Sequence, residues 1–204
     1  MALSTYTELQ TALASWLGRT DLTSQIPDFV KIAEARFNRE IRTPQMIERD
    51  EGFSVSGQYV SLPTGFLEAL RLTLLTEPVT PVEYLTPEEM SVRRAGSYTT
   101  GKPRWFTVIG GSFEFLPAPD DTYTASLTYY KKLDGLATTS PNWLLTSHPD
   151  IYLFGSLVAA EAYVMNDERL PVWKAQVDEA LASLRVEGSR REIGGTPKPT
   201  IRSF

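Results

Sequence analysis

The spacing of apolar residues changes twice along this 204-residue chain, and the two changes constrain its fold more than any other feature. From Thr5 to about Ile41, apolar residues recur every three or four positions, which is the period of an amphipathic helix. From about Glu51 they alternate with polar residues, as in a half-buried strand. Helical spacing returns after Pro141. The sequence therefore predicts a β-rich segment between two helical segments.

Two helices are predicted in the first segment, over residues 5–18 and 24–43. Thr5 and Glu8 have the spacing of a capping box, in which each side chain accepts a hydrogen bond from the other residue's free backbone N–H. The second helix has to end before Pro44, because the residue that precedes a proline is pushed out of the α region.

The middle segment, 51–134, is predicted to be a β-rich insertion. Gly57 marks a turn between two short strands, and the Gly110-Gly111 pair is typical of a tight hairpin turn with positive φ. A short helix is expected within this segment, capped by Thr86.

Two further helices are predicted at 149–165 and 168–187. The first is apolar nearly all round, which indicates a buried helix, and its Gly155 would allow another helix to approach closely. It is too short to span a membrane and contains Glu161. The predicted fold class is α+β: a helical bundle formed by 1–50 and 135–187, the β-rich insertion, and an extended C-terminal tail over 188–204, called the C-terminal segment below.

The composition excludes several kinds of site. Without cysteine, the chain forms no disulfide and no thiolate-ligated zinc site. The only histidine, His148, could form a relay with Asp150, but a helix cap just before Pro149 is the favoured interpretation. No cofactor or metal is predicted.

Paired carboxylates leave a second interpretation open, a small hydrolase without cysteine or histidine chemistry. The candidates are Glu88 with Glu89, Asp120 with Asp121, and Glu161. The adjacent pairs are typical of solvated surface charges. Glu161 is expected to pair with a buried arginine, either Arg36 or Arg169.

Basic residues gather in local clusters, which include the Lys131-Lys132 pair and the C-terminal segment. The chain as a whole nevertheless carries a net charge of −5, which does not favour a phosphate backbone as partner. One cluster, in the β-rich insertion, comprises Arg93, Arg94, Lys102 and Arg104 beside Trp105. A tryptophan among cations can stack on a base, but a tryptophan in a hairpin is more often part of a core. Opposite patches on an acidic protein also suit contacts between subunits.

The chain also carries a set of core signatures: a tyrosine-rich strand that ends at Tyr129-Tyr130, then "NWLL", "HPDIYLFGSL", an acidic turn "NDER" and a tryptophan-bearing helix. Upstream lie "IPDFVKIAEARFNREIR" and "LPTGFLEALRL". Together these elements resemble phage head-to-tail adaptor proteins of short-tailed phages, over most of residues 5–187.

The resemblance implies a structural virion protein and no enzyme. Such proteins form a ring, a dodecamer in the family, that docks under the portal protein and extends the DNA channel. Genomic double-stranded DNA would pass through without sequence-specific binding, and no membrane is involved. The expected location is the capsid–tail junction of the virion, with assembly in the host cytoplasm. Two alternatives stay open: a carboxylate-dependent hydrolase, for example of cell walls, and another head-completion or tail-terminator protein.

The resemblance also gives two of these basic regions expected partners. The C-terminal segment is expected to reach the portal, with spaced apolar anchors and positive charge suited to a groove lined with acids. Its expected contacts are Arg190, Arg191, Ile193, Lys198, Ile201, Arg202 and Phe204. The β-rich insertion is expected to face the phage tail or nozzle protein through Arg93, Arg94, Lys102, Arg104 and Trp105.

Overall fold

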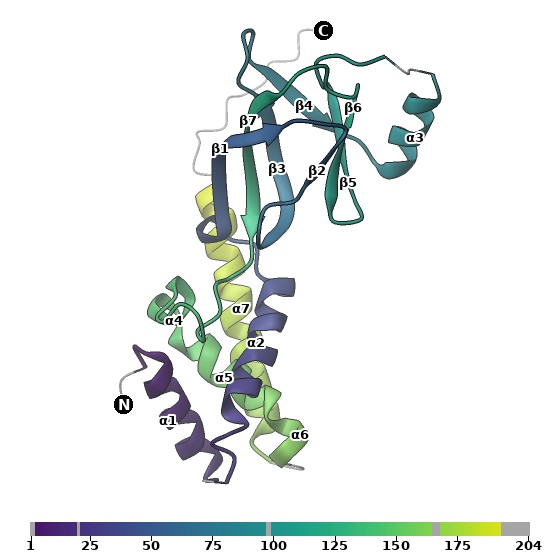
Figure 1. The fold of residues 1–204 in the computed structure, drawn as a ribbon. Helices are drawn as coiled ribbons and strands as arrows, with labels where there is room; N and C mark the ends of the chain where they lie inside the picture. The colour runs from purple at the N-terminus through teal and green to yellow at the C-terminus, as the bar shows by residue number, and fades with distance from the viewer. Residues whose placement is uncertain (1–2, 20, 97–98, 165–167, 193–204) are drawn as a thin grey trace, which may run out of the picture. The chain divides into compact units, whose positions relative to one another are not determined.

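The chain divides into two compact units in the computed structural model. The structure describes residues 3–19, 21–96, 99–164 and 168–192, and within them the side chains of all residues except 162 and 189–192. The helical unit comprises 1–45 and 133–204, and the β-rich unit comprises 46–132 (Figure 1). The mixed α+β class predicted from the sequence is confirmed.

The helical unit contains the first two helices of the chain and the helices after the β-rich unit. They are α1 (Tyr6–Leu17), α2 (Ile26–Glu40), α4 (Trp143–Ser147), α5 (Pro149–Ala159), α6 (Glu161–Val164) and α7 (Leu170–Glu192). The capping box at the start of α1 is confirmed, since Thr5 and Glu8 bond each other's backbone N–H. Gly18 ends this helix in the left-handed conformation, with a φ of 65°, as expected of a helix-terminating glycine.

Helix α5 is the centre of the helical unit, because it packs against α1, α2, α4 and α7 (Figure 1). Ile151 and Leu157 are fully buried. The close approach predicted at Gly155 is confirmed: a Cβ at this position would lie 2.6 Å from Cζ of Phe37 on α2. The same phenylalanine ring packs edge-on against Tyr152, with centroids 5.3 Å apart.

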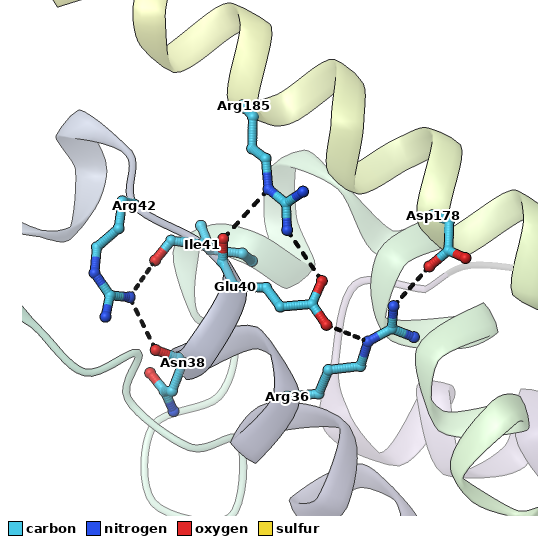
Figure 2. Close-up of polar contacts among 7 residues, drawn as sticks. All are labelled: Arg36, Asn38, Glu40, Ile41, Arg42, Asp178 and Arg185. Carbon is cyan, nitrogen blue, oxygen red and sulfur yellow. Dashed lines mark hydrogen bonds and ion pairs between the residues drawn. The ribbon is translucent and has the colours of Figure 1, made fainter.

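Charged side chains join α2 to α7 on the surface of the helical unit (Figure 2). Arg36 of α2 donates to Glu40 one turn later, at 2.7 Å, and to Asp178 of α7, at 2.6 Å. Arg185 of α7 reaches back to Glu40 at 3.1 Å. Arg42 donates to two carbonyl oxygens at the end of α2, at 2.9 and 2.7 Å. Partly exposed ion pairs contribute about 0–1 kcal/mol each, so the network fixes helix register more than it adds stability.

A polar cluster lies in the interior of the helical unit and joins α2, α5 and the segment before α4. Tyr152 donates to Oε1 of Glu34 at 3.2 Å and accepts from Nδ2 of Asn142 at 2.7 Å. Oε1 of Glu34 also accepts from the backbone N of Leu136 at 2.7 Å. Burial raises the pKa of Glu34, although the hydrogen bonds from Leu136 and Tyr152 lower it. Burial also raises the pKa of Tyr152.

The predicted helix over 149–165 is wrong in its extent. Helix α5 ends at Ala159, and Ala160 forms a tight turn in which its N–H bonds the carbonyls of Ser156 and Leu157. A new short helix, α6, starts at Glu161. Within the described part of the chain, no helix combines the length and apolarity needed to cross a bilayer.

The boundary predicted for the C-terminal segment is also wrong, because α7 runs on to Glu192. Gly188 is buried, and a Cβ there would lie 3.4 Å from Cγ2 of Thr43 and 3.7 Å from Cδ of Pro44. Glycine costs a helix about 1 kcal/mol relative to alanine, which is why the sequence predicts a stop there. Contact with the end of the N-terminal helical segment overrides that local preference.

In the β-rich unit, the described residues form one seven-stranded sheet with the order β1-β7-β3-β4-β5-β6-β2. The strands are β1 (Ile47–Val55), β2 (Tyr59–Ser61), β3 (Phe66–Leu74), β4 (Thr80–Tyr84), β5 (Trp105–Ile109), β6 (Ser112–Leu116) and β7 (Tyr123–Lys131). The β4–β5 pair is parallel and the other pairs are antiparallel. Gly110 and Gly111 take φ values of 58° and 82°, so the predicted hairpin turn between β5 and β6 is confirmed.

Alternating side chains of these strands build an aromatic core. Phe113 lies at its centre, with ring centroids 5.3–5.8 Å from those of Phe53, Phe66 and Phe106. Aromatic edge-to-face pairs of this kind add about 0.5–1.5 kcal/mol each beyond the area they bury. The predicted alternation therefore produces one continuous core.

Two features of the sheet differ from the sequence analysis. Strands β1 and β2 flank the predicted turn at Gly57 but pair with β7 and β6 rather than with each other. Strand β4, which contains Pro81, was not predicted. The short helix, α3 (Pro87–Ala95), begins at Pro87 with Thr86 as its cap, as predicted.

Candidate partner-binding site

The parallel pairing of β4 and β5 positions the basic cluster of the β-rich unit. Glu83 of β4 lies opposite Trp105 of β5 in the register. Parallel strands need a crossover connection, and here it contains α3, which packs on β5 and has Met90 as its buried residue. Because the Thr86 capping box fixes where α3 starts, Arg93 falls in its last turn, near Trp105.

A hollow of about 720 Å³ opens between the end of α3, the start of β5 and the end of β6. It is called the basic hollow below. Its basic side chains are Arg93, Lys102 and Arg104, and its apolar walls include Trp105, Leu116, Pro78, Pro103 and Pro117. The backbone around it is pinned: Arg104 N donates to Leu116 O at 3.0 Å, and Gly101 N donates to Ala118 O at 2.9 Å.

Three of the lining side chains are held in place by neighbours. The guanidinium carbon of Arg93 lies 4.5 Å from the centroid of the Trp105 ring, a cation–π contact. Nε1 of Trp105 donates to Oε2 of Glu83 at 3.3 Å. Nζ of Lys102 donates to the carbonyl oxygen of Pro78 at 2.9 Å. Arg104 is exposed. Arg93, Lys102 and Arg104 form no ion pair with any described residue.

Arg94 differs from the other residues predicted for this surface. It does not line the basic hollow; its guanidinium pairs with the buried carboxylate of Glu114 on β6 and lies 3.5 Å from the hydroxyl of Tyr59. Four of the five residues expected to face the phage tail thus line one hollow, and the fifth ties α3 to the sheet. Sequence reasoning missed Pro78, Leu116 and Pro117, because only the strand pairing brings them to Trp105.

The carboxylates considered as catalytic groups of a hydrolase lie in structural or exposed positions. Glu89 completes the Thr86 capping box, and the hydrogen bonds from Thr86 lower its pKa. Oδ1 of Asp120 accepts from the hydroxyl of Tyr123 at 2.6 Å. Glu161 is exposed at the start of α6, and the expected pairing with Arg36 or Arg169 is wrong.

The arginines proposed as partners of Glu161 bind elsewhere. Arg36 bonds Glu40 and Asp178, as described above. Arg169 donates to the carbonyl oxygen of Trp16 at 3.0 Å and stacks over Trp173. Among the residues that the structure describes, no cluster of three or more histidine, aspartate or glutamate side chains could hold a metal ion.

His148 occupies the predicted cap position of α5, but its side chain makes no capping hydrogen bond. A side-chain cap is found instead at the preceding short helix, α4. Oδ1 of Asn142 accepts from the backbone N of Leu145 at 3.0 Å and starts α4, a helix that the sequence analysis did not predict.

The residues expected to contact the portal lie at the edge of the described chain or beyond it. Arg190 and Arg191 belong to the last turn of α7. Ile193, Lys198, Ile201, Arg202 and Phe204 lie outside the described residues.

Comparison of the sequence with models of known families gives a match. A model of the SU10 adaptor protein family matches residues 4–199, which is nearly the whole chain and includes both units. The chain belongs to the SU10 adaptor protein family. No curated protein matches it by sequence.

Membership in the SU10 adaptor family confirms the resemblance to phage adaptor proteins that the core signatures indicate. It implies that the partners of this chain are other virion proteins and that its place is the virion. A family of adaptors is typically structural, and the basic hollow has the character of a binding surface: fixed cations on a largely apolar lining.

Proposed function

We propose that this protein is a head-to-tail adaptor that forms a ring, a dodecamer in the virion, under the portal. The observation that carries the proposal is the family match over residues 4–199. In this role the protein extends the DNA channel and gives the phage tail or nozzle protein a surface to attach to. It acts by binding and has no enzymatic activity.

The two units suit different contacts. Helix α7 of the helical unit ends at Glu192, and the residues after it, 193–204, include Lys198 and Arg202 together with the apolar Ile201 and Phe204. An extended peptide of this type suits a groove with acidic rims and apolar pockets. We assign portal binding to this segment and tail binding to the basic hollow. Ordering a peptide typically costs about 2–5 kcal/mol of the interaction energy, so many copies in a ring would be needed for firm attachment.

The experiment that tests portal binding uses two changes at the C-terminus. One variant is truncated after Glu192, which keeps all of α7 and the contact of Gly188 with Thr43. The other replaces 193–204 with a glycine–serine segment of equal length. Both should keep the wild-type melting temperature and lose co-sedimentation with purified portal rings. Normal docking by either variant would refute the assignment.

Ring formation is tested separately by electron microscopy of the full chain mixed with portal rings. The expected image is a second ring, of dodecameric symmetry, stacked on the portal. A single copy bound per portal ring would contradict the proposal. A cell-wall hydrolysis assay of the wild type and Glu161→Gln addresses the enzymatic alternative, with no activity expected from either.

A further inference from the structure

We propose that the basic hollow binds a short acidic segment of a partner protein, one in which carboxylates flank apolar residues. The inference rests on the proposed function, since it names the chemistry of the partner that meets the β-rich unit. It begins with the charges. Arg93, Lys102 and Arg104 converge on the hollow, and no carboxylate of a described residue forms an ion pair with them.

The neighbouring Arg94 shows that this lack of pairing is local. One position further along α3, its guanidinium meets the buried Glu114. The helix therefore carries one cation used within the fold and one, Arg93, left at the hollow. Cations that form no ion pair, on a chain of net charge −5, complement an acidic ligand at short range.

The donors are also pre-positioned. Arg93 is stacked on Trp105, Trp105 is bonded to Glu83, and the ammonium of Lys102 is anchored on the carbonyl oxygen of Pro78. Fixed side chains lose little rotamer freedom when a ligand binds, which favours affinity. Carboxylates match guanidinium groups well because two N–H donors can bond two oxygens.

The walls select for apolar groups beside the carboxylates. Pro103 and Leu116 are almost fully covered by their neighbours and form, with Pro117, a rigid apolar lining. The volume of about 720 Å³ lies within the range of roughly 300–1,000 Å³ that is typical of ligand pockets. Such a space takes a few residues of an extended segment.

The same features disfavour a nucleic acid. One face of the Trp105 ring is covered by Arg93, and the carboxylate of Glu83 stands at its edge. A stacked base needs an open aromatic face, and Arg93 already occupies one face of this ring. A long polyanion would also be repelled by the net negative charge of the rest of the chain, whereas a short peptide interacts mainly with the local cations.

The test uses the full chain and three fluorescein-labelled probes: the peptide GEELPEEG, its amide analogue GQQLPQQG, and an oligothymidylate with the net charge of the acidic peptide. Fluorescence anisotropy should show binding of the acidic peptide alone. Arg104→Glu should weaken it by about tenfold or more, the equivalent of about 1.4 kcal/mol. Lys132→Glu is the matched control, since it reverses an exposed cation of the same unit outside the hollow and should change binding by less than about twofold.

Arg93→Gln gives a second readout, because it uncovers Trp105 without reversing a charge. It should weaken peptide binding and change the tryptophan fluorescence of the unbound protein. Circular dichroism checks that each variant is folded.

Three results would overturn the inference. One is equal binding of the acidic and amide peptides, or binding of neither. Another is tighter binding of the oligothymidylate, lost in Arg104→Glu, which would make the hollow a nucleic-acid site. The third is self-association of the wild type in analytical ultracentrifugation that Arg104→Glu abolishes, which would make a second copy the occupant. In the proposed function, portal docking depends on residues 193–204, so Arg104→Glu should leave portal docking unchanged. The peptide-binding assay and the portal-docking assay therefore test the two proposals separately.

Discussion

Replacing Tyr152 with phenylalanine tests how much the buried polar cluster stabilises the helical unit. The change removes one hydroxyl from a side chain with no solvent exposure. Two hydrogen bonds disappear: the one donated to Glu34 at 3.2 Å and the one accepted from Asn142 at 2.7 Å. The ring itself keeps its edge-on contact with Phe37.

The expected loss of unfolding free energy follows from these contacts. A hydrogen bond to a charged group contributes about 1.5–3 kcal/mol, and the length of the bond to Glu34 places it at the lower end. Asn142 is buried, and one of its Nδ2 hydrogens would lose its acceptor, which costs about 1–3 kcal/mol. Together these effects predict a loss of about 3 kcal/mol at neutral pH.

The loss should also depend on pH. Burial raises the pKa of Glu34 in the folded protein, so this group favours folding while it is protonated, and its contribution falls as the pH rises through the folded pKa. The hydrogen bond from Tyr152 lowers that pKa, and removing the hydroxyl raises it further. The destabilisation by Tyr152→Phe should therefore be larger at about pH 7.5 than at about pH 4.5, near the ordinary pKa of a glutamate.

Urea unfolding followed by far-UV circular dichroism measures both effects. The control is Tyr163→Phe, the same chemical change at a tyrosine that is 53% exposed, and it should alter stability by no more than about 0.5 kcal/mol. A double-mutant cycle with Glu34→Gln isolates the pairwise energy. A loss below about 0.5 kcal/mol for Tyr152→Phe, or no coupling in the cycle, would refute the reasoning.

The other predictions concern α5 and the hairpin turn. Leu157→Asp should abolish folding of the helical unit, because an unpaired charge at a fully buried position costs several kcal/mol; native-like circular dichroism would contradict this. His148→Ser should cost less than about 1 kcal/mol in urea unfolding, and particle assembly should survive, since the imidazole makes no capping bond. Gly111→Ala, at a φ of 82°, should lower stability by about 1–2 kcal/mol, whereas Gly101→Ala, where a Cβ meets nothing within 4 Å, should be nearly neutral.

The sequence by itself determined the local structure wherever a short-range rule applies. The capping boxes at Thr5 and Thr86 start α1 and α3 as predicted, because the bonded partners are three residues apart. Gly18 and the Gly110-Gly111 pair end or turn the chain because positive φ suits glycine. The change of apolar period likewise located the strands other than β4 and the buried character of α5, and core signatures sufficed to indicate the adaptor family.

The candidate site was only half predictable. The cations and Trp105 stand close together in the sequence, so their clustering was visible. The different roles of the two neighbouring arginines were not visible in the sequence. Arg93 lines the hollow and Arg94 pairs with Glu114 because of how α3 packs on β5 and β6. Successive side chains on a helix point about 100° apart, so Arg93 and Arg94 face different surroundings. The residues packed against each face of the helix then decide what each arginine does.

Tertiary structure alone decided the features that depend on residues far apart in the chain. Gly188 locally favours the end of α7, yet α7 continues to Glu192. Strands β1 and β2 follow one another but pair with different partners, and Glu34 finds Tyr152 across 118 positions. The physical reason is the same in each case: local preferences amount to about 1 kcal/mol, and burial against a distant segment outweighs them.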